Sequence, residues 1–328
     1  MPIRTWEIAI AAVFLVFCLA VGLVLGNQVA PQPAIGLVRF ASEIDFNSAE
    51  QFISLLEAAR QDDQIAGVVI ELLSPGGYAT SSESIYYAML SLREQKPLVI
   101  VVDGLAASGG YYMAAAGNRI FAPASAYVGN IGTRGGRPED PSIAVDELSS
   151  GPYKLEGGSR FDQIHQLDLV AQAFIKNVVS QRSASPVNPL KLTAEEVGEA
   201  RIYLGSEALA VGLIDGEGSR SAGIQAAAEL ANLSSYRVVG LEEYLGMPAV
   251  PPPDPPTQAS QSMMAQAPPG TIFMLDSRIP LPVPALPPAL RALASKRHGD
   301  SVVPNGGTGR SWADTLLSPS TLRQPAGD

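Results

Sequence analysis

The chain is poor in the residues that form disulfides, zinc sites and aromatic cores. Its 328 residues include one cysteine, Cys18, two histidines and 6% aromatic residues. A lone cysteine cannot form an intramolecular disulfide, and with two distant histidines it cannot complete a Cys/His zinc site. These shortages exclude structural zinc and dithiol redox chemistry, and we expect neither a metal nor any other cofactor.

Positive charge is scarce as well. The 22 Lys and Arg residues are outnumbered by 32 Asp and Glu, which gives a net charge of −10. Binding to nucleic-acid phosphates requires clustered Lys and Arg. The composition therefore predicts that no nucleic acid is a partner of this chain.

One long apolar run lies near the beginning of the chain. Residues 8–26 form 19 consecutive uncharged positions, and such a helix, rising about 1.5 Å per residue, nearly crosses a hydrocarbon layer of ~30 Å. A cleaved signal peptide is the alternative, but its apolar region is usually shorter and ends in a small-x-small site. Arg4 precedes the run and the next basic residue is Arg39. We predict that residues 1–26 are a lipid-embedded single-pass anchor in the cell membrane, with the body of the protein outside the cytoplasm.

Residues 34–245 alternate between strand and helix patterns. Apolar runs at 34–40, 66–73 and 98–102 predict buried strands, and 236–239 predicts a short one. Apolar residues with helical spacing follow Asn47, which forms a capping pattern with Glu50. Helical patterns recur in six later segments: 82–95, 109–116, 161–182, 193–197, 206–211 and 222–233. Buried strands joined by helices predict an α/β fold with a parallel sheet.

The segment 246–328 has a different composition, since 16 of the 27 prolines follow residue 246. Such a proline-rich segment cannot bury a core, and we expect most of it to be disordered. The stretch 271–286 is more apolar than a solvated tail requires. An extended strand docked on another surface is therefore the alternative for this stretch.

Two glycine turns follow consecutive predicted strands, at 74–77 and 106–110. Ligand sites of open parallel sheets lie at this carboxyl edge. Each turn alone is ordinary, because Ser-Pro-Gly-Gly is a common turn and Ser108 is a common helix N-cap. Their separation, from Gly77 to Ser108, matches one strand-helix-strand unit and brings them side by side. The pair predicts backbone N–H groups that form an oxyanion hole around an attacking Ser108 hydroxyl.

A serine nucleophile requires a base, and few residues of the body qualify. His165, the only histidine there, and Lys176 fall on the polar face of a predicted helix. Lys96 precedes a strand at the opposite sheet edge, and Lys191 lies in a proline-bounded turn. Lys154 therefore remains as the candidate base, and the alternative is that Lys154 is an ordinary surface lysine. As a base it needs a pKa lowered from about 10.4 towards 7, which desolvation can achieve.

Five motifs resemble those of one known family, in order and spacing: Ser74–Gly77, Ala107–Tyr112, Gly129–Gly132, Gly151–Lys154 and Gly212–Asp215. Over about residues 34–240 the chain resembles the signal peptide peptidase A (SppA) family of membrane-anchored serine proteases. That family is similar in fold to the crotonase and Clp protease group. The resemblance implies stacked βα units around a parallel sheet.

The resemblance also implies roles for single residues: Ser108 as nucleophile, Lys154 as general base, Gly77 and Gly109 as oxyanion-hole donors, and Gly76 and Tyr111 as substrate contacts. Two positions depart from the family pattern. Asn130 stands where Ser is common, and Leu155 follows Lys154 where Asp is common. Neither departure removes a catalytic group, but the resemblance then does not fix the substrate preference or the local support of Lys154.

These observations predict a membrane-anchored serine endopeptidase that cleaves signal-peptide remnants or other membrane-associated peptides, and the resemblance implies a homo-oligomeric ring. The first alternative is a catalytically silent scaffold of the same fold, anchored in the membrane. The second is an acyl-CoA enzyme of the crotonase type, which needs neither a lysine base nor an anchor.

Overall fold

The computed structural model describes residues 5–29, 32–135, 160–248, 262–264, 266–267 and 271–276. The elements are α1 (Thr5–Val29), β1 (Ala34–Phe40), α2 (Phe46–Gln61), β2 (Ile65–Ser74), β3 (Gly76–Tyr78), α3 (Ala79–Arg93), β4 (Leu98–Ala107), α4 (Gly109–Ala115), β5 (Arg119–Ala122), β6 (Tyr127–Gly129), β7 (Arg134–Gly135), α6 (Arg160–Ser183), α7 (Ala194–Gly198), β8 (Ile202–Leu204), α8 (Gly205–Ala210), β9 (Gly216–Glu217), α9 (Arg220–Leu230), β10 (Arg237–Gly240), α10 (Leu241–Tyr244) and β11 (Ile272–Leu275).

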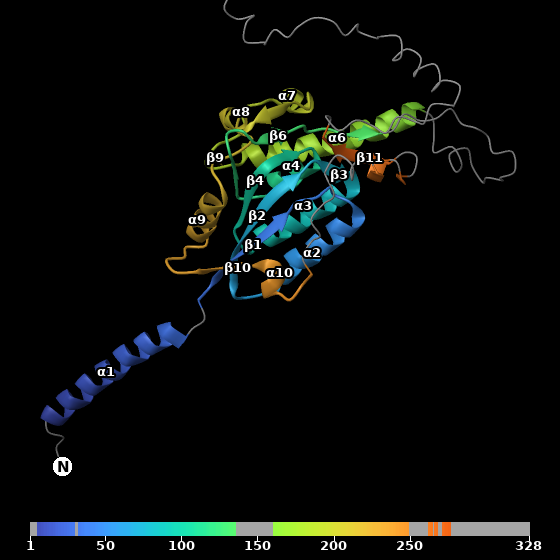
Figure 1. The fold of residues 1–328 in the computed structure, drawn as a ribbon. Helices are drawn as coiled ribbons and strands as arrows, with labels where there is room; N and C mark the ends of the chain where they lie inside the picture. Colours follow the sequence, from blue (N-terminus) through green and yellow to red (C-terminus); the bar gives the residue numbers. More distant parts are fainter. Residues whose placement is uncertain are drawn as a thin grey trace, which may run out of the picture. The chain divides into compact units, whose positions relative to one another are not determined.

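The main sheet confirms the predicted α/β fold. Its strands run in the order β10-β1-β2-β4-β5-β9, all parallel, and β6 continues alongside β4 while β8 pairs antiparallel with β6. Helix α9 covers one face of the sheet, and α2, α3 and α4 cover the other (Figure 1). The central strands are apolar on both faces because both faces are buried. Val69 faces α9, and Ile70 faces the opposite layer.

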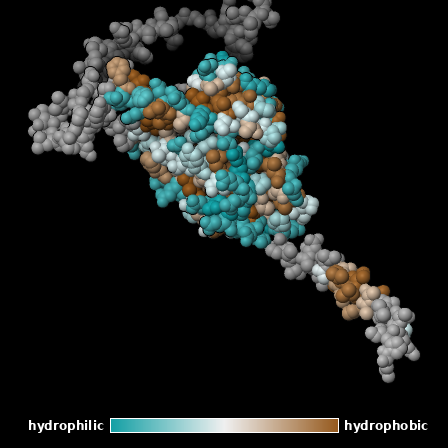
Figure 2. Space-filling model, turned by 180° about the vertical axis from the view of Figure 1, so that it is seen from behind, coloured by the Kyte–Doolittle hydropathy of each residue, from teal (hydrophilic) through white to brown (hydrophobic). Residues whose placement is uncertain are grey.

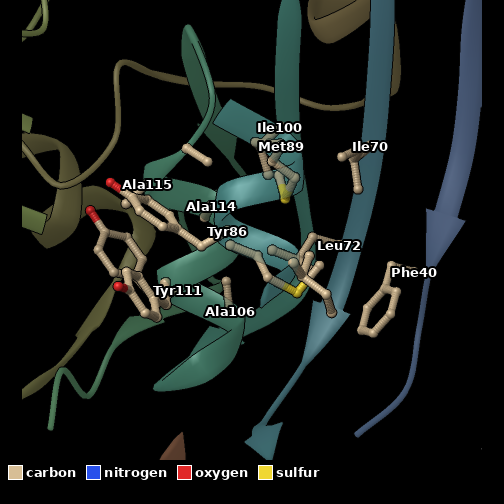
Figure 3. Close-up of a cluster of buried hydrophobic side chains, with 14 of the residues drawn as sticks. Phe40, Ile70, Leu72, Tyr86, Met89, Ile100, Ala106, Tyr111, Ala114 and Ala115 are labelled. Carbon is tan, nitrogen blue, oxygen red and sulfur yellow. The ribbon is translucent and has the colours of Figure 1, made fainter. Parts of the chain in front are cut away.

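The larger core layer lies between the sheet and helices α3 and α4. Figure 3 shows Ile70, Leu72 and Ile100 of the strands beside Met89 of α3 and Ala114 of α4. Helix α6 joins this layer through Phe174, whose ring centroid lies 4.6 Å from that of Tyr112. The core therefore fixes α4, the helix that begins immediately after Ser108.

Two helix predictions need correction. Helix α2 starts earlier than predicted, because its N-cap is Asp45, whose carboxylate accepts from the Ser48 N–H at 2.7 Å. In α6 the predicted apolar face is buried only in the second half of the helix. Phe161 and Ile164 remain 81% and 43% exposed, whereas Phe174 and Val178 are fully buried. The spacing of the apolar residues predicted the helix correctly, but it did not predict that only the second half of the helix packs against the core.

Helix α1 exposes apolar side chains such as Val13, Phe14 and Phe17, and it is the hydrophobic stretch at the lower right of Figure 2. Within the parts of the chain that the structure describes, none of the helices has the length and apolar content needed to cross a membrane. The membrane helix predicted for residues 8–26 is not supported by this finding and stays a prediction.

A second sheet contains a strand from the proline-rich tail. Its order is β3-β11-β7, and β11 is antiparallel to both neighbours. For residues 272–275, the structure thus agrees with the docked strand rather than with disorder. The rest of the apolar stretch, 277–286, lies outside the described residues.

Candidate active site

The structure brings the two glycine turns together, as predicted from their spacing. Ser74, at the end of β2, pairs with Ala106 near the end of β4. Beyond these strand ends the backbones of the two turns approach each other closely, since a Cβ added to Gly76 would lie 2.8 Å from the Gly109 nitrogen. Both turns therefore line one small region at the carboxyl edge of the parallel sheet.

Ser108 occupies a strained position between β4 and α4. Its backbone angles are φ 55° and ψ −119°, a conformation that costs a non-glycine residue about 1–3 kcal/mol. Its N–H donates to the Gly129 carbonyl at 2.8 Å, and its Oγ donates to the Gly132 carbonyl at 3.3 Å. A serine on a sharp, strained strand-to-helix turn is a typical nucleophile geometry.

The loop 129–132 holds both carbonyls that contact Ser108. It turns through two left-handed positions, Gly129 with φ 114° and Asn130 with φ 53°. The Asn130 backbone N–H donates to the Arg201 carbonyl at 2.7 Å, and its side-chain amide donates to the Ala200 carbonyl at 2.8 Å. Asn tolerates this conformation better than most residues. The motif was recognised in the sequence, but its support of Ser108 was not predicted.

The direction of the Gly77 N–H group follows from its neighbours. The Gly76 carbonyl accepts from the Ile44 N–H at 2.9 Å, and the Tyr78 N–H donates to the Ile44 carbonyl at 2.8 Å. Because backbone groups alternate in direction along a strand, the N–H and C=O of Gly77 face the opposite side, towards its partner Met274 on β11. The predicted donor therefore points away from Ile44 and into the second sheet.

Gly109 is packed too closely to carry a side chain. A Cβ at this position would lie 2.3 Å from the Ser82 Oγ and 3.0 Å from the Met274 carbonyl oxygen. Ser82 is fully buried on α3 and donates to the Tyr78 carbonyl at 2.8 Å. Ser82 was not predicted as part of the site, because its distance to Gly109 is set by helix packing.

Lys154 and the whole motif 151–154 lie outside the described residues. The other candidate bases are placed as the sequence predicted. Lys96 donates to the Ala59 and Asp62 carbonyls, and burial lowers its pKa; Lys191 donates to the Ala210 carbonyl. His165 and Lys176 are exposed on α6. In the described ranges no group of three His, Cys, Asp or Glu side chains is arranged to hold a metal ion.

Tyr111, a predicted substrate contact, is fully buried. Its hydroxyl donates to the Leu213 carbonyl at 2.7 Å, and burial raises its pKa. Nearby, Asp215 accepts from Arg182 at 2.8 and 3.0 Å and from the Ile120 N–H at 2.8 Å. The side chain of Tyr111 thus ties α4 to the segment 212–215, and its role as a substrate contact stays a prediction.

Comparison with known proteins gives the family. A model described as "Peptidase family S49" matches residues 91–139, which include Ser108. "Putative protease MJ0651" of Methanocaldococcus jannaschii is 32% identical over 216 residues, which cover 61% of this chain and 68% of that protein. The chain belongs to peptidase family S49.

Other relatives are longer than the region that they share with this chain. "Serine protease SPPA, chloroplastic" of Arabidopsis thaliana is 30% identical over 63% of this chain but only 32% of its own length. "Protease 4" of Salmonella typhi is 29% identical over 69% of this chain and 38% of its own length. A solved variant of "1510-N membrane-bound stomatin-specific protease", in complex with a substrate peptide, has a TM-score of 0.45 and 17% identity, covering 71% of this chain and 98% of that one.

Proposed function

We propose that this S49 chain is a serine endopeptidase that uses a Ser108/Lys154 dyad. The Ser108 Oγ attacks the carbonyl carbon of a peptide bond, and its proton passes to the uncharged Lys154 amine. Lys154 then protonates the leaving amine, and a water molecule hydrolyses the acyl-enzyme in the second half of the reaction. The observation that carries the proposal is the strained Ser108, buried beside the backbones of Gly76 and Gly109.

The N–H groups of Gly77 and Gly109 are the proposed oxyanion-hole donors. Gly77 faces away from Ile44, and Gly109 begins α4, where the first N–H groups have no intrahelical partner. One such donor is typically worth about 2.7–4 kcal/mol in the transition state. Both positions depend on glycine, because a side chain on either residue would collide with its neighbours.

The proposed setting is the membrane surface, with membrane-associated peptides such as signal-peptide remnants as substrates. The uncharged run 8–26 supports this proposal, and so do the exposed apolar residues of α1. The test is extraction of membranes from cells that express the full chain. Retention after alkaline carbonate and release by detergent are expected, whereas release by carbonate alone would contradict an integral anchor.

A homo-oligomer is also proposed, through the exposed apolar part of α6. Phe161 and Ile164 are large apolar side chains three residues apart, hence neighbours on the helix surface, and both remain exposed. Exposed apolar surface of this kind can mark a protein interface. Phe161→Ser is expected to lower the molecular mass of the assembly that sedimentation in detergent measures. Phe46, which is exposed on α2, provides the control variant Phe46→Ser. Unchanged sedimentation of Phe161→Ser would contradict this interface.

The dyad is tested with a fluorogenic peptide library and detergent-solubilised full chain. Ser108→Ala and Lys154→Ala are each expected to reduce kcat by roughly 10³-fold or more, whereas His165→Ala keeps the wild-type rate. The wild-type rate is expected to rise through a pKa well below that of a free lysine. Full activity of Lys154→Ala would overturn the dyad. No cleavage of any peptide by wild type would favour the silent scaffold instead.

A further inference from the structure

Strand β11 lies inside the proposed active site. It is inserted between β3 and β7, where Met274 pairs with Gly77 and Phe273 pairs with both Tyr78 and Arg134. Strand β3 carries the proposed donor Gly77. A tail segment thus completes a small antiparallel sheet at the point where a peptide substrate must approach Ser108.

The Met274 carbonyl lies where a substrate carbonyl is expected. The Asp276 N–H donates to the Pro75 carbonyl at 2.7 Å, and Met274, two residues earlier, faces the same neighbouring strand. A Cβ added to Gly76 would lie 1.9 Å from the Met274 oxygen, and one added to Gly109 would lie 3.0 Å from it. The carbonyl therefore lies against both glycine turns, next to the residue that follows Ser108.

The side chains of β11 are buried on both faces of the strand. Phe273 and Leu275 pack with Met264 and Tyr78, and the rings of Phe273 and Tyr78 stack at 5.1 Å. Met274 points the other way and belongs to the main core. The exposed fractions of the three side chains are only 2–4%. The space between β3 and β7 that β11 fills, which we call the groove, thus accommodates consecutive bulky apolar residues.

The second edge of the groove is formed by β7. Arg134 donates through Nη1 to the Asp276 carbonyl at 3.0 Å, so the end of the segment is held by a side chain as well as by strand pairing. Because these contacts involve backbone on two sides of β11, they are available to any extended peptide. The apolar contacts supply the sequence preference.

We propose that residues 271–276 occupy the peptide-binding groove of this chain and compete with peptide substrates. The proposal rests on the proposed endopeptidase function. It also defines the partner that the groove fits, an extended peptide with consecutive bulky apolar residues at the positions of Phe273, Met274 and Leu275. Because the segment is covalently attached, it is present at a high effective concentration, and free peptides must displace it.

The test uses full-length Met274→Asp, which places a charge where the core buries Met274, with Met274→Leu as the matched control. Met274→Asp is expected to raise kcat/KM for a fluorogenic apolar peptide at least tenfold, and Met274→Leu is expected to match wild type. A synthetic peptide of residues 271–276 is expected to inhibit Met274→Asp competitively, whereas the same peptide with Asp in place of Met is not. Phe273→Ala is the second variant if Met274→Asp fails to fold, with the same expected direction.

Hydrogen exchange of the peptide that contains Gly77 separates docking from catalysis. Faster exchange in Met274→Asp than in Met274→Leu is expected, because the Gly77 N–H faces β11. Faster exchange in Met274→Asp, without cleavage of any peptide by any variant, would support the docking of the segment but contradict the proposed peptidase activity. Equal kcat/KM in the two variants, or unchanged exchange, would overturn the proposal that this segment competes for the groove.

Discussion

The Ser108 Oγ donates a hydrogen bond to the Gly132 carbonyl oxygen at 3.3 Å. The length of this bond indicates a weak interaction, so little energy is needed to turn the hydroxyl towards a base. The backbone N–H of Ser108 is held more tightly, at 2.8 Å from the Gly129 carbonyl. The loop 129–132 therefore fixes the strained backbone of the nucleophile and leaves its side chain comparatively free.

The strain at Ser108 predicts an unusual order of stability between two variants. Ser108→Gly is expected to be more stable than Ser108→Ala by about 1 kcal/mol or more, because glycine adopts positive φ without a steric cost. Ser219 provides the control, since it is also an N-cap without a side-chain capping bond but has φ −129°. Urea unfolding of the four variants measures both differences. A Gly-to-Ala difference at Ser108 no larger than that at Ser219 would disprove the strain.

The contact between Gly109 and Ser82 predicts a compensating pair. Gly109→Ala is expected to lose about 1–3 kcal/mol of stability and most of its activity, because its Cβ would lie 2.3 Å from the Ser82 Oγ. Adding Ser82→Ala removes that atom and is expected to restore part of the stability. Gly240→Ala, which has open space, is the control. Additive costs in the double-mutant cycle would show that the two residues do not collide.

The features of the fold that could be predicted from the sequence are those that long apolar runs determine. The run at 34–40 forms β1 with the same bounds, and the spacing of the two glycine turns correctly predicted that they lie side by side. Strands β3, β6, β7 and β8 have two or three residues each, so they contain no periodic pattern and form only through pairing with distant segments. The left-handed backbone of Ser108 has no sequence signal either, because the tertiary contacts of loop 129–132 impose it.

For β11 the sequence identified the segment but not its partner. The apolar composition of 271–286 suggested a docked strand, yet composition carries no information on register. The pairing of Met274 with Gly77 depends on the edges of β3 and β7, two strands that lie far apart in the sequence and are joined in this sheet by β11.

The buried ion pair between Arg182 and Asp215 predicts non-additive losses. Both side chains are at most 2% exposed, and two hydrogen bonds join them. Asp215→Asn or Arg182→Met is expected to cost about 3–5 kcal/mol, because either change leaves a buried group without its partner. The double variant is expected to cost clearly less than the sum. The exposed pair Arg39 and Asp103 is the control, with an expected cost below about 1 kcal/mol.

Chemical denaturation of the Arg182 and Asp215 variants measures this coupling. Single substitutions that lower the free energy of unfolding no more than substitutions in the exposed pair do would contradict a structural role for the buried pair. A double variant that costs the full sum would show that the two side chains act independently.

Tyr111 predicts a loss of stability at alkaline pH. Burial raises its pKa, so above about pH 10 the unfolded chain releases this proton while the folded chain retains it, and stability falls as pH rises. Tyr111→Phe is expected to cost about 1 kcal/mol at neutral pH through the lost bond to Leu213, but to lose less further stability at about pH 10.5. Tyr87→Phe, at an exposed position, is the control. Urea midpoints at both pH values decide the matter, and an alkaline loss in Tyr111→Phe equal to that of the control would refute the contribution of this hydroxyl.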